Sequence, residues 1–516
     1  MIINVPNAGS IGLNRDLSDH EMPLGAFTSA ENIRFLDGYA GQFLGHGQVY
    51  EGATITPYHI LPVFIDSNRY WIYASLNKIS TVVLTGGVIT HTDLTRSSGG
   101  DYSAQPNQWT SATLGGIPVL NPGNTTDVPQ SWDLNISNKF VPLDAWPANT
   151  YCKAMRTYKQ FLIALNITKP SGNFPFMVKW SNPAVPGALP TSWDETDPTN
   201  DAGEFDIAEG FDPIVDGLQL RDSFMIYKEQ SVWRLDFTGG PFVFSNQKVL
   251  GVSGAMNRNC IVEIDGYHLV LTNNDIVVHD GVQGTSVLDK IMRRWLFQNI
   301  DIESFDKSFV FKNPFFNEVF ICFAMVGSNV PNRAIVYNYV DKTTSLRVMP
   351  DIHCAAYGPI NEGLNANWAQ DPDPWFTDNT AWNSPDLVPS LSRVLMGSTN
   401  KIFLLDSSLS FDGVTPSAWM ERRGLSFGKA ENIKIVKGIR PRITGSQGTE
   451  VLVMVGSQND PYEDPTYTTM THVIGSTVRN DCLVSGRYIS VKFENSNSFR
   501  WRLDSYDIEI DTVGEW

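Results

Sequence analysis

The 516-residue sequence has few charged residues, few cysteines and no long apolar run. Charged residues make up 18%, below the roughly 25% of a typical soluble domain, and this composition excludes a coiled coil. The longest uninterrupted apolar stretch, Val319 to Val326, is far too short to cross a bilayer, and no apolar signal segment follows Met1. Because 42% of the residues are hydrophobic, a disordered chain is excluded as well. We therefore expect a soluble globular protein with no membrane insertion.

Cysteine pairs are also missing. The sequence contains no CxxC spacing, and its five cysteines stand singly, at Cys152, Cys260, Cys322, Cys354 and Cys482. An odd number of scattered cysteines argues against a disulfide framework and against a zinc site. We expect synthesis in a reducing compartment.

The sequence offers no established catalytic motif, neither HExxH nor GxSxG. Asp197, Thr199, Asp201 and Gly203 resemble a calcium-binding loop, but the glycine comes one position late and Ala208 stands where a glutamate is needed. We interpret this stretch as a solvated acidic loop. We expect no enzyme activity, no cofactor and no catalytic or metal-binding residues, although a close pair of carboxylates of the glycosidase type stays open as an alternative.

What the chain does have is an excess of acidic residues. Lys and Arg total 38, Asp and Glu total 55, and the net charge is −17. The region from Ser417 to Trp516 holds 12 basic and 13 acidic residues, so the first 416 residues carry nearly all of the excess. A chain of this charge should not bind DNA over its general surface, because affinity for phosphate comes from Lys and Arg.

Two short segments have strongly one-sided charge. The first has nine acids and no base: Asp194, Glu195, Asp197, Asp201, Glu204, Asp206, Glu209, Asp212 and Asp216. The second has seven bases and the single acid Glu431: Arg422, Arg423, Lys429, Lys434, Lys437, Arg440 and Arg442. We treat the first set as candidates for an acidic channel or rim, and the second as candidates for a subunit or adaptor interface. A solvated basic strand face is the alternative for the second set.

Short strands separated by tight turns recur along the chain. The first clear unit consists of Tyr70–Ala74, Ile79–Leu84 and Val88–Thr92, with glycines at the second turn that tolerate positive φ. Related units span residues 160–180, 224–244, 267–280, 318–339 and 393–406, and a poorly defined one lies near residues 108–145. About seven units therefore fit between residues 57 and 416, somewhat longer than familiar propeller blades.

This pattern predicts an all-β protein whose main body is a β-propeller of about seven blades, because radial repetition of small sheets leaves few exposed edges. Residues 1–56 would form an N-terminal segment with a propeller-closing strand, and residues 57–416 the propeller, with loop-like insertions at 181–214 and 358–390. A pair of stacked β-sandwich domains is the alternative.

The last hundred residues, 417–516, have a different pattern. Val451–Val455 is apolar on both faces, as in a central strand, whereas Ile489, Val491 and Phe493 alternate with polar residues. We predict a C-terminal antiparallel β-sandwich-like domain with one wet face.

One amphipathic helix is predicted within the main body. Leu288, Ile291, Met292, Trp295 and Leu296 recur at helical spacing and would form one apolar face.

Several segments, in their order along the chain, resemble a known family. They are Glu31–Arg34 with Asp37-Gly38, then Val215–Leu235, Gly251–Gly254, Tyr267–Asp280 and Asp289–Arg294. This order resembles the tail nozzle, or packaged-DNA-stabilisation, proteins of short-tailed bacteriophages (podoviruses). The resemblance covers most of the chain and is one of order and pattern, with no single diagnostic motif.

The resemblance implies a non-enzymatic structural protein of the virion tail, assembled in the host cytoplasm. It implies a homo-oligomeric ring, typically a hexamer, that extends the DNA channel below the portal and its adaptor ring. Such a ring retains the packaged genome and conducts it during ejection. Implied partners are the adaptor, tail fibres, a spike or plug protein, and phage DNA passing without sequence-specific binding.

An acidic wall agrees with that role, because negative charge repels phosphate within roughly 8–10 Å in physiological salt. Two other functions stay open: a glycan-binding or glycan-degrading phage tail propeller, and a cellular propeller scaffold.

Overall fold

A computed structural model describes residues 1–65, 68–85, 87–240, 242–251, 253–360, 392–428, 430–495, 497 and 499–515. The described chain is all-β, apart from the short helix α1 (Arg293–Asn299) and two 3-10 turns (Phe305–Lys307 and Pro314–Phe316). Most of the strands belong to four-stranded antiparallel sheets, which confirms the prediction of an all-β protein built from small antiparallel sheets.

Six four-stranded sheets are each built from consecutive strands. The first is β8 (His59–Ile65), β9 (Asn68–Ala74), β10 (Ile79–Thr85) and β11 (Val88–Asp93). The second is β12 (Thr110–Leu114), β13 (Ile117–Asn121), β14 (Gln130–Ser131) and β15 (Val141–Pro142). The third is β16 (Tyr151–Tyr158), β17 (Phe161–Lys169), β18 (Gly172–Trp180) and β19 (Gly203–Asp206).

The fourth sheet is β20 (Ile214–Leu220), β21 (Ser223–Lys228), β22 (Val232–Phe237) and β23 (Phe244–Leu250). The fifth is β24 (Ile261–Ile264), β25 (Tyr267–Leu271), β26 (Ile276–His279) and β27 (Gly284–Ser286). The sixth is β28 (Phe309–Asn313), β29 (Glu318–Phe323), β30 (Arg333–Asn338) and β31 (Thr344–Val348).

A further four-stranded sheet combines both halves of the chain. It contains β32 (Ile352–Pro359), β33 (Ser392–Ser398) and β34 (Lys401–Ser408), and its last strand is β7 (Gly45–Val49). β7 pairs antiparallel with β34, so that Val49 lies opposite Ile402. A segment from the N-terminal part of the chain therefore completes this sheet.

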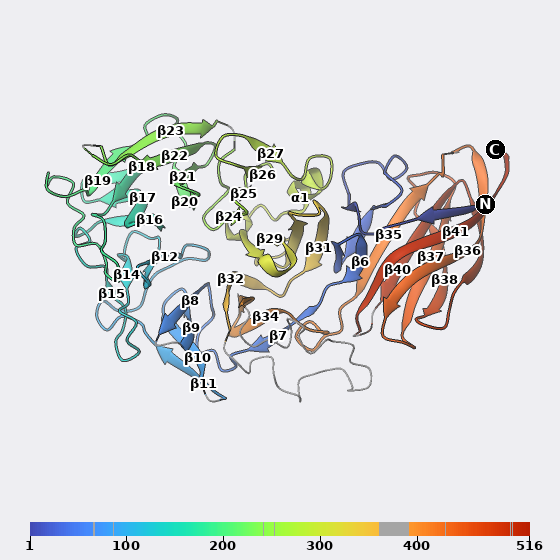
Figure 1. Cartoon of the computed structure of the whole chain (residues 1–516), viewed down its shortest axis with the longest axis horizontal. Helices are drawn as coiled ribbons and strands as arrows, with labels where there is room; N and C mark the ends of the chain where they lie inside the picture. Colours follow the sequence, from blue (N-terminus) through green and yellow to red (C-terminus); the bar gives the residue numbers. More distant parts are fainter. Residues whose placement is uncertain are drawn as a thin grey trace.

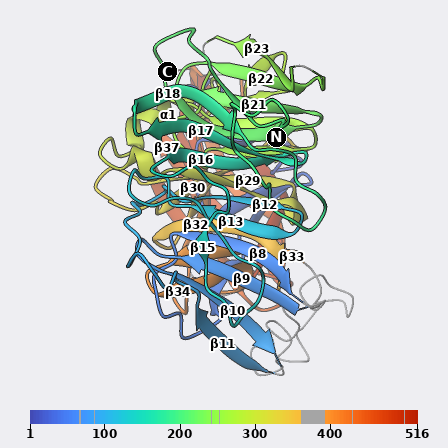
Figure 2. The same cartoon turned by 90° about the vertical axis from the view of Figure 1, so that its left-hand side faces the viewer.

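These sheets are arranged around a common centre (Figure 1). The first strand of most sheets contributes residues to one small central cavity, and the later strands lie farther out. Viewed from the side, β11 lies at the bottom and β23 at the top, with β12 and β16 between them (Figure 2). The arrangement is propeller-like.

Local sequence explains why these strands form and where they turn. The central strand β17 is buried over its first seven residues, as expected for a strand covered on both faces. The turn between β33 and β34 contains Asn400 at φ +54°, a left-handed conformation that asparagine tolerates.

Two larger sheets lie beside this ring. One contains β38 (Thr466–Val473), β37 (Glu450–Gln458), β40 (Tyr488–Asn495), β35 (Ala418–Leu425) and β4 (Ser29–Glu31). The other contains β39 (Asn480–Gly486), β36 (Asn432–Gly445), β41 (Trp501–Glu515), β6 (Tyr39–Gln42), β5 (Ile33–Leu36) and β1 (Ile2–Val5), which pairs with β41. The remaining strands, β2 (Gly12–Leu13) and β3 (Ala26–Phe27), form a parallel pair.

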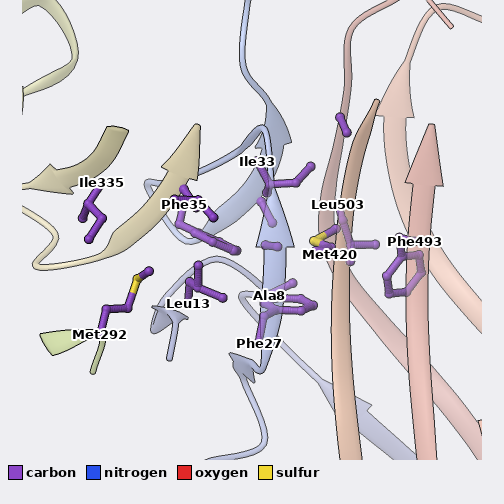
Figure 3. Packing of buried hydrophobic residues seen from close by; sticks show 14 of the residues in the cluster. Ala8, Leu13, Phe27, Ile33, Phe35, Met292, Ile335, Met420, Phe493 and Leu503 are labelled. Carbon is purple, nitrogen blue, oxygen red and sulfur yellow. The ribbon is translucent and has the colours of Figure 1, made fainter. Parts of the chain in front are cut away.

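The N-terminal strands connect the two parts of the molecule. Most of them join the sheets formed by the C-terminal residues, which the sequence pattern did not predict. Their apolar side chains, including Leu13 and Phe35, pack between Ile335 of the ring and Met420 and Leu503 of the larger sheets (Figure 3). The core therefore runs without interruption from one part to the other.

The predicted helix is shorter than its apolar pattern. Helix α1 begins only at Arg293, because Lys290 has φ +58° and ends any helical path there. Asp16 instead caps the helix from a distant segment: its carboxylate accepts from the amides of Arg294 and Trp295 at 2.8 and 3.0 Å. The helix start was therefore predicted too early.

Two further expectations concern the cysteines and the insertions. All five cysteines are free thiols, in agreement with their scattered positions. The predicted insertion at 181–214 contains strand β19, whereas most of the predicted insertion at 358–390 lies outside the described residues.

Candidate functional site

The central cavity is where the sheets of the ring converge. It has a volume of about 140 Å³. Its main charged pair is Arg156 of β16 and Asp216 of β20: Nε and Nη2 of Arg156 donate to the two carboxylate oxygens at 2.8 and 2.7 Å. Asn259 also joins the pair, because its backbone amide donates to Asp216 at 3.1 Å. This two-pronged geometry is the strongest form of a charged hydrogen bond.

A second set of hydrogen bonds ties neighbouring sheets together at the centre. Asn107 donates from Nδ2 to the carbonyl of Ser308 at 3.0 Å, and Asn259 donates from Nδ2 to Asn107 Oδ1 at 2.9 Å. Arg258 donates from Nη1 to the carbonyl of Lys153 at 2.9 Å. Burial lowers the pKa of Arg258 to about 10. Polar side chains thus fill most of the centre and leave little free space.

A buried charge cluster joins the N-terminal segment to the ring. Arg34 of β5 donates from Nε to Glu318 at 2.7 Å and from Nη2 to Asp406 at 2.7 Å. Arg347 of β31 donates from Nη1 to the other oxygen of Asp406 at 2.8 Å, and from Nη2 to the carbonyl of Leu44 at 2.7 Å. We call Arg34, Glu318, Arg347 and Asp406 the joint cluster.

Electrostatics in the joint cluster are balanced. Burial raises the pKa of Glu318. Burial acts in the same direction on Asp406, but Arg34 and Arg347 outweigh it and lower the pKa of that carboxyl. Two buried cations therefore face two buried anions, and each charge depends on the others because none can be hydrated.

A third buried cluster lies between the fourth and fifth sheets. The amide of Gly281 donates to His279 Nδ1 at 3.2 Å, so the proton of His279 is on Nε2, which donates to Tyr227 Oη at 2.7 Å. Tyr227 Oη donates to His268 Nδ1 at 2.6 Å, and His268 Nε2 donates to the carbonyl of Gln219 at 3.0 Å. Every donor in this series of hydrogen bonds has an acceptor only while both imidazoles are neutral.

Burial accounts for that neutrality. It lowers the pKa of His268 to about 3 and that of His279 to about 4.

The structure divides the predicted acidic set. Asp216 lies at the central cavity, opposite Arg156. The others lie on β19 and the loops around it, and β19 is the outer edge of its sheet. Lys179 is buried and donates to Glu195 and Glu204 at 2.5 and 3.1 Å.

Further members of the set are paired with lysines, Asp212 with Lys228 at 3.2 Å and Glu209 with Lys248 at 2.8 Å. Asp194, Asp197, Asp201 and Asp206 have no Lys or Arg partner within the described part of the chain.

The predicted basic set is divided as well. Arg422 and Lys434 are buried and donate to backbone carbonyls: Arg422 to Asp19 at 2.6 Å and Lys434 to Arg487 at 2.6 Å. Burial lowers the pKa of Lys434 to about 8. These two side chains therefore cannot present charge at the surface of the chain. Lys429 lies outside the described residues.

The partly or fully exposed members of the basic set form pairs within the chain. Arg423 lies 3.0 Å from Glu421 and 3.1 Å from Asp464. Lys437, Arg440 and Arg442 follow β36 and face acids on the neighbouring strand β41. The pairs are Lys437–Asp511 at 2.5 Å, Arg440–Glu509 at 3.6 Å and Arg442–Asp507 at 2.7 Å. We call these six residues the charge ladder.

Over the described ranges, no three His, Cys, Asp or Glu side chains are grouped so as to hold a metal ion. Nor does any described helix have the length and hydropathy needed to span a membrane.

The main body is a propeller-like assembly of small sheets. No protein-family model matches the chain, and no curated protein matches it. Among solved structures, it is similar to the extracellular domain of a putative one-component system from B. thetaiotaomicron, with a TM-score of 0.40 and 7% identity over 89% of this chain. The chain covers 59% of that structure. It is also similar to the WD40 domain of Toxoplasma gondii coronin, with a TM-score of 0.36 and 8% identity over 76% of this chain and 87% of that one.

Sequence reasoning missed the buried clusters. Arg34 belongs to the opening segment that carried the family resemblance, and Asp216 to the acidic set, but nothing local marks either as buried. Their partners lie far away in sequence: Asp406 is 372 residues from Arg34, and Arg156 is 60 residues from Asp216. Only the folded topology brings these groups together.

Proposed function

We propose that this chain is a structural virion protein, the tail nozzle of a short-tailed phage. Copies of it form a ring, which the family resemblance predicts to be a hexamer. The ring extends the DNA channel below the portal adaptor, retains the genome and conducts it during ejection. The observation that carries this proposal is the uneven charge. The first 416 residues hold nearly all of the net −17. Among the described residues, Asp194, Asp197, Asp201 and Asp206 have no Lys or Arg partner.

The proposal includes a finer architecture. The main body is a seven-bladed propeller in which β7 closes the last blade, and the C-terminal region 417–516 with the N-terminal strands forms a β-sandwich-like domain that shares its core with the propeller. The sequential pairing of the strands and the shared central cavity support the propeller. The two larger sheets, which share one core, support the sandwich.

A DNA passage would lie between copies. Within one chain the centre is filled by the hydrogen bonds of Arg156, Asp216, Asn107 and Asn259, and the cavity of about 140 Å³ is too small for a nucleic-acid strand. Only a ring of several copies could surround DNA. The mass of purified particles tests this: a closed ring of several copies supports the nozzle, a monomer favours a scaffold, and a trimer favours a glycan-binding spike.

Repulsion of DNA is the second test. A purified ring should release duplex DNA at about 0.15 M salt, because an acidic wall still repels phosphate groups that come within roughly 8 Å of it. Converting Asp194, Asp197, Asp201 and Asp206 to asparagine should increase retention of DNA, because no described Lys or Arg neutralises these acids. The matched control converts Asp507, Glu509 and Asp511, which are paired in the ladder, to their amides. Retention of DNA by the unaltered ring would contradict the proposal.

For the adaptor or subunit interface we retain Lys437, Arg440 and Arg442, which are exposed on β36. Reversing Arg440 and Arg442 to glutamate should block ring assembly or adaptor binding. Because this reversal also breaks pairs within the chain, a swapped variant, Arg442→Asp with Asp507→Arg, keeps the internal pair and moves the positive charge to β41. Normal assembly of the reversed variant would refute the docking role.

A further inference from the structure

Strand β38 is an edge of the five-stranded sheet. It pairs with β37 without a bulge, from Glu450 opposite Val473 to Ser457 opposite Thr466. In the described part of the chain no strand pairs with its other side. An unpaired edge exposes backbone donors and acceptors that another strand can use.

Hydrogen bonds at the end of β38 show which residues turn their backbone outward. The amide of Val473 donates to Thr477 Oγ1 at 3.1 Å, and the carbonyl of Thr471 accepts from Asn480 Nδ2 at 3.0 Å. Because outward groups alternate along an antiparallel strand, Tyr467 and Thr469 also direct their amides and carbonyls outward. These groups are free within the described residues, as is the amide of Thr471, whereas the final turn covers Val473.

Strand β38 lacks the features that usually prevent an edge strand from pairing with another strand. Its sequence, Thr-Tyr-Thr-Thr-Met-Thr-His-Val, contains no Asp, Glu, Lys, Arg or Pro. Natural edge strands are commonly blocked by lysine, proline or a bulge. Threonine and tyrosine also favour extended structure. This edge is therefore suited to accept a strand.

Charge around the edge restricts what can occupy it. Asp460, Glu463 and Asp464 precede the strand and are exposed, and among the described residues only Asp464 has an arginine partner, Arg423. At the other end of β38, the exposed Glu450 of the neighbouring strand β37 lies opposite Val473. A second copy pairing antiparallel through the same edge would bring these acids together, which disfavours self-association.

We propose that β38 binds an extended segment of a partner protein by strand addition, and that this segment has an uncharged β-forming centre with Lys or Arg at its ends. Main-chain hydrogen bonds to Tyr467, Thr469 and Thr471 hold the segment, and the flanking acids select its charge. The argument for this surface does not rest on ring formation or on DNA passage, so it can fail while the proposed function stands.

Hydrogen exchange of the full chain tests the proposal. The probe is a synthetic peptide of alternating valine and threonine with lysines at both ends, and its matched control has glutamates at both ends. We expect the lysine peptide to slow exchange of the Tyr467, Thr469 and Thr471 amides by about tenfold or more, and the glutamate peptide to leave them unchanged.

Two substitutions isolate the backbone contribution. Thr469→Pro removes one outward amide but leaves the pairing with β37 intact, so it should abolish protection by the lysine peptide. Thr469→Val keeps the amide and should retain protection. The proposal is overturned if the two peptides protect equally, if neither protects, or if protection rises with the concentration of the protein alone, which would identify a second copy as the occupant.

Discussion

The paired charges at the centre of the ring and the charge ladder of the larger sheets are placed in opposite ways. Arg156 and Asp216 are buried within the ring, and the joint cluster is buried between the ring and β5; each of these charges is paired with a residue far away in sequence. In the larger sheets, the charge ladder lies on an open face between neighbouring strands. The comparison predicts that a charged pair stabilises the fold strongly where it is buried and adds little where it is exposed.

The joint cluster should show the largest effect. Arg34→Met leaves Glu318 and one oxygen of Asp406 buried without their cation, and we expect a loss of about 3–5 kcal/mol of unfolding free energy. Urea unfolding followed by tryptophan fluorescence measures it. The matched control is Arg502→Met on β41, where the exposed pair with Asp504 should contribute at most about 1 kcal/mol. Equal losses for the two variants would remove the distinction between the regions.

The central pair should follow. Asp216→Asn keeps the shape of the side chain but leaves Arg156 and the amide of Asn259 with a weaker acceptor. We expect a loss of about 2–3 kcal/mol, measured in the same unfolding experiment. Glu509→Gln in the ladder is the control, and a similar loss there would contradict the view that burial sets the cost.

Acid should destabilise the ring through the buried histidines. The pKa of His268 is about 3 and that of His279 about 4 in the folded chain, against about 6.5 when unfolded. The unfolded chain therefore binds more protons as pH falls below 6.5, and each histidine removes about 1.4 kcal/mol of stability per pH unit until its folded pKa is reached.

The variant His279→Gln should make the loss of unfolding free energy with falling pH less steep between pH 6 and 4. The slope should decrease by the contribution of one histidine, up to about 1.4 kcal/mol per pH unit. The measurement is urea unfolding at a series of pH values, with His20→Gln as the control because His20 is partly exposed. An unchanged slope for His279→Gln would show that the buried chain of hydrogen bonds does not require neutral imidazoles.

The ladder should give the smallest effect. A double-mutant cycle of Arg442→Ala and Asp507→Ala should yield a coupling of about 0.2–1 kcal/mol that shrinks as salt is added. A coupling as large as the loss expected for Arg34→Met, or one that is insensitive to salt, would show that the exposed ladder does not differ from the buried joint cluster.

The sequence predicted the repeated strands well because their signal is local. Alternating residues and turn glycines or asparagines, such as Asn400, mark each strand and its turn. The helix was predicted too early because an apolar pattern at 288–296 says nothing about the positive φ of Lys290. The division of the basic set could not be predicted either, since Arg422 and Lys434 are buried by segments that contact them only in the folded chain.

The candidate sites were less predictable than the fold for the same reason. Net charge identified the acidic and basic segments, but not which members would be neutralised. Lys179, which pairs with two of the acids, shows no distinguishing feature in its own strand. The roles of the segments in a tail nozzle stay predictions.

The pairing of β1 with β41 has a consequence for biosynthesis. Residues 2–5 emerge from the ribosome long before their partners at 506–509. At roughly 5–20 residues per second, the opening segment waits about 25–100 s before it can complete its sheet. The strands of this sheet should therefore stay incompletely paired on the nascent chain until residues 506–509 are available.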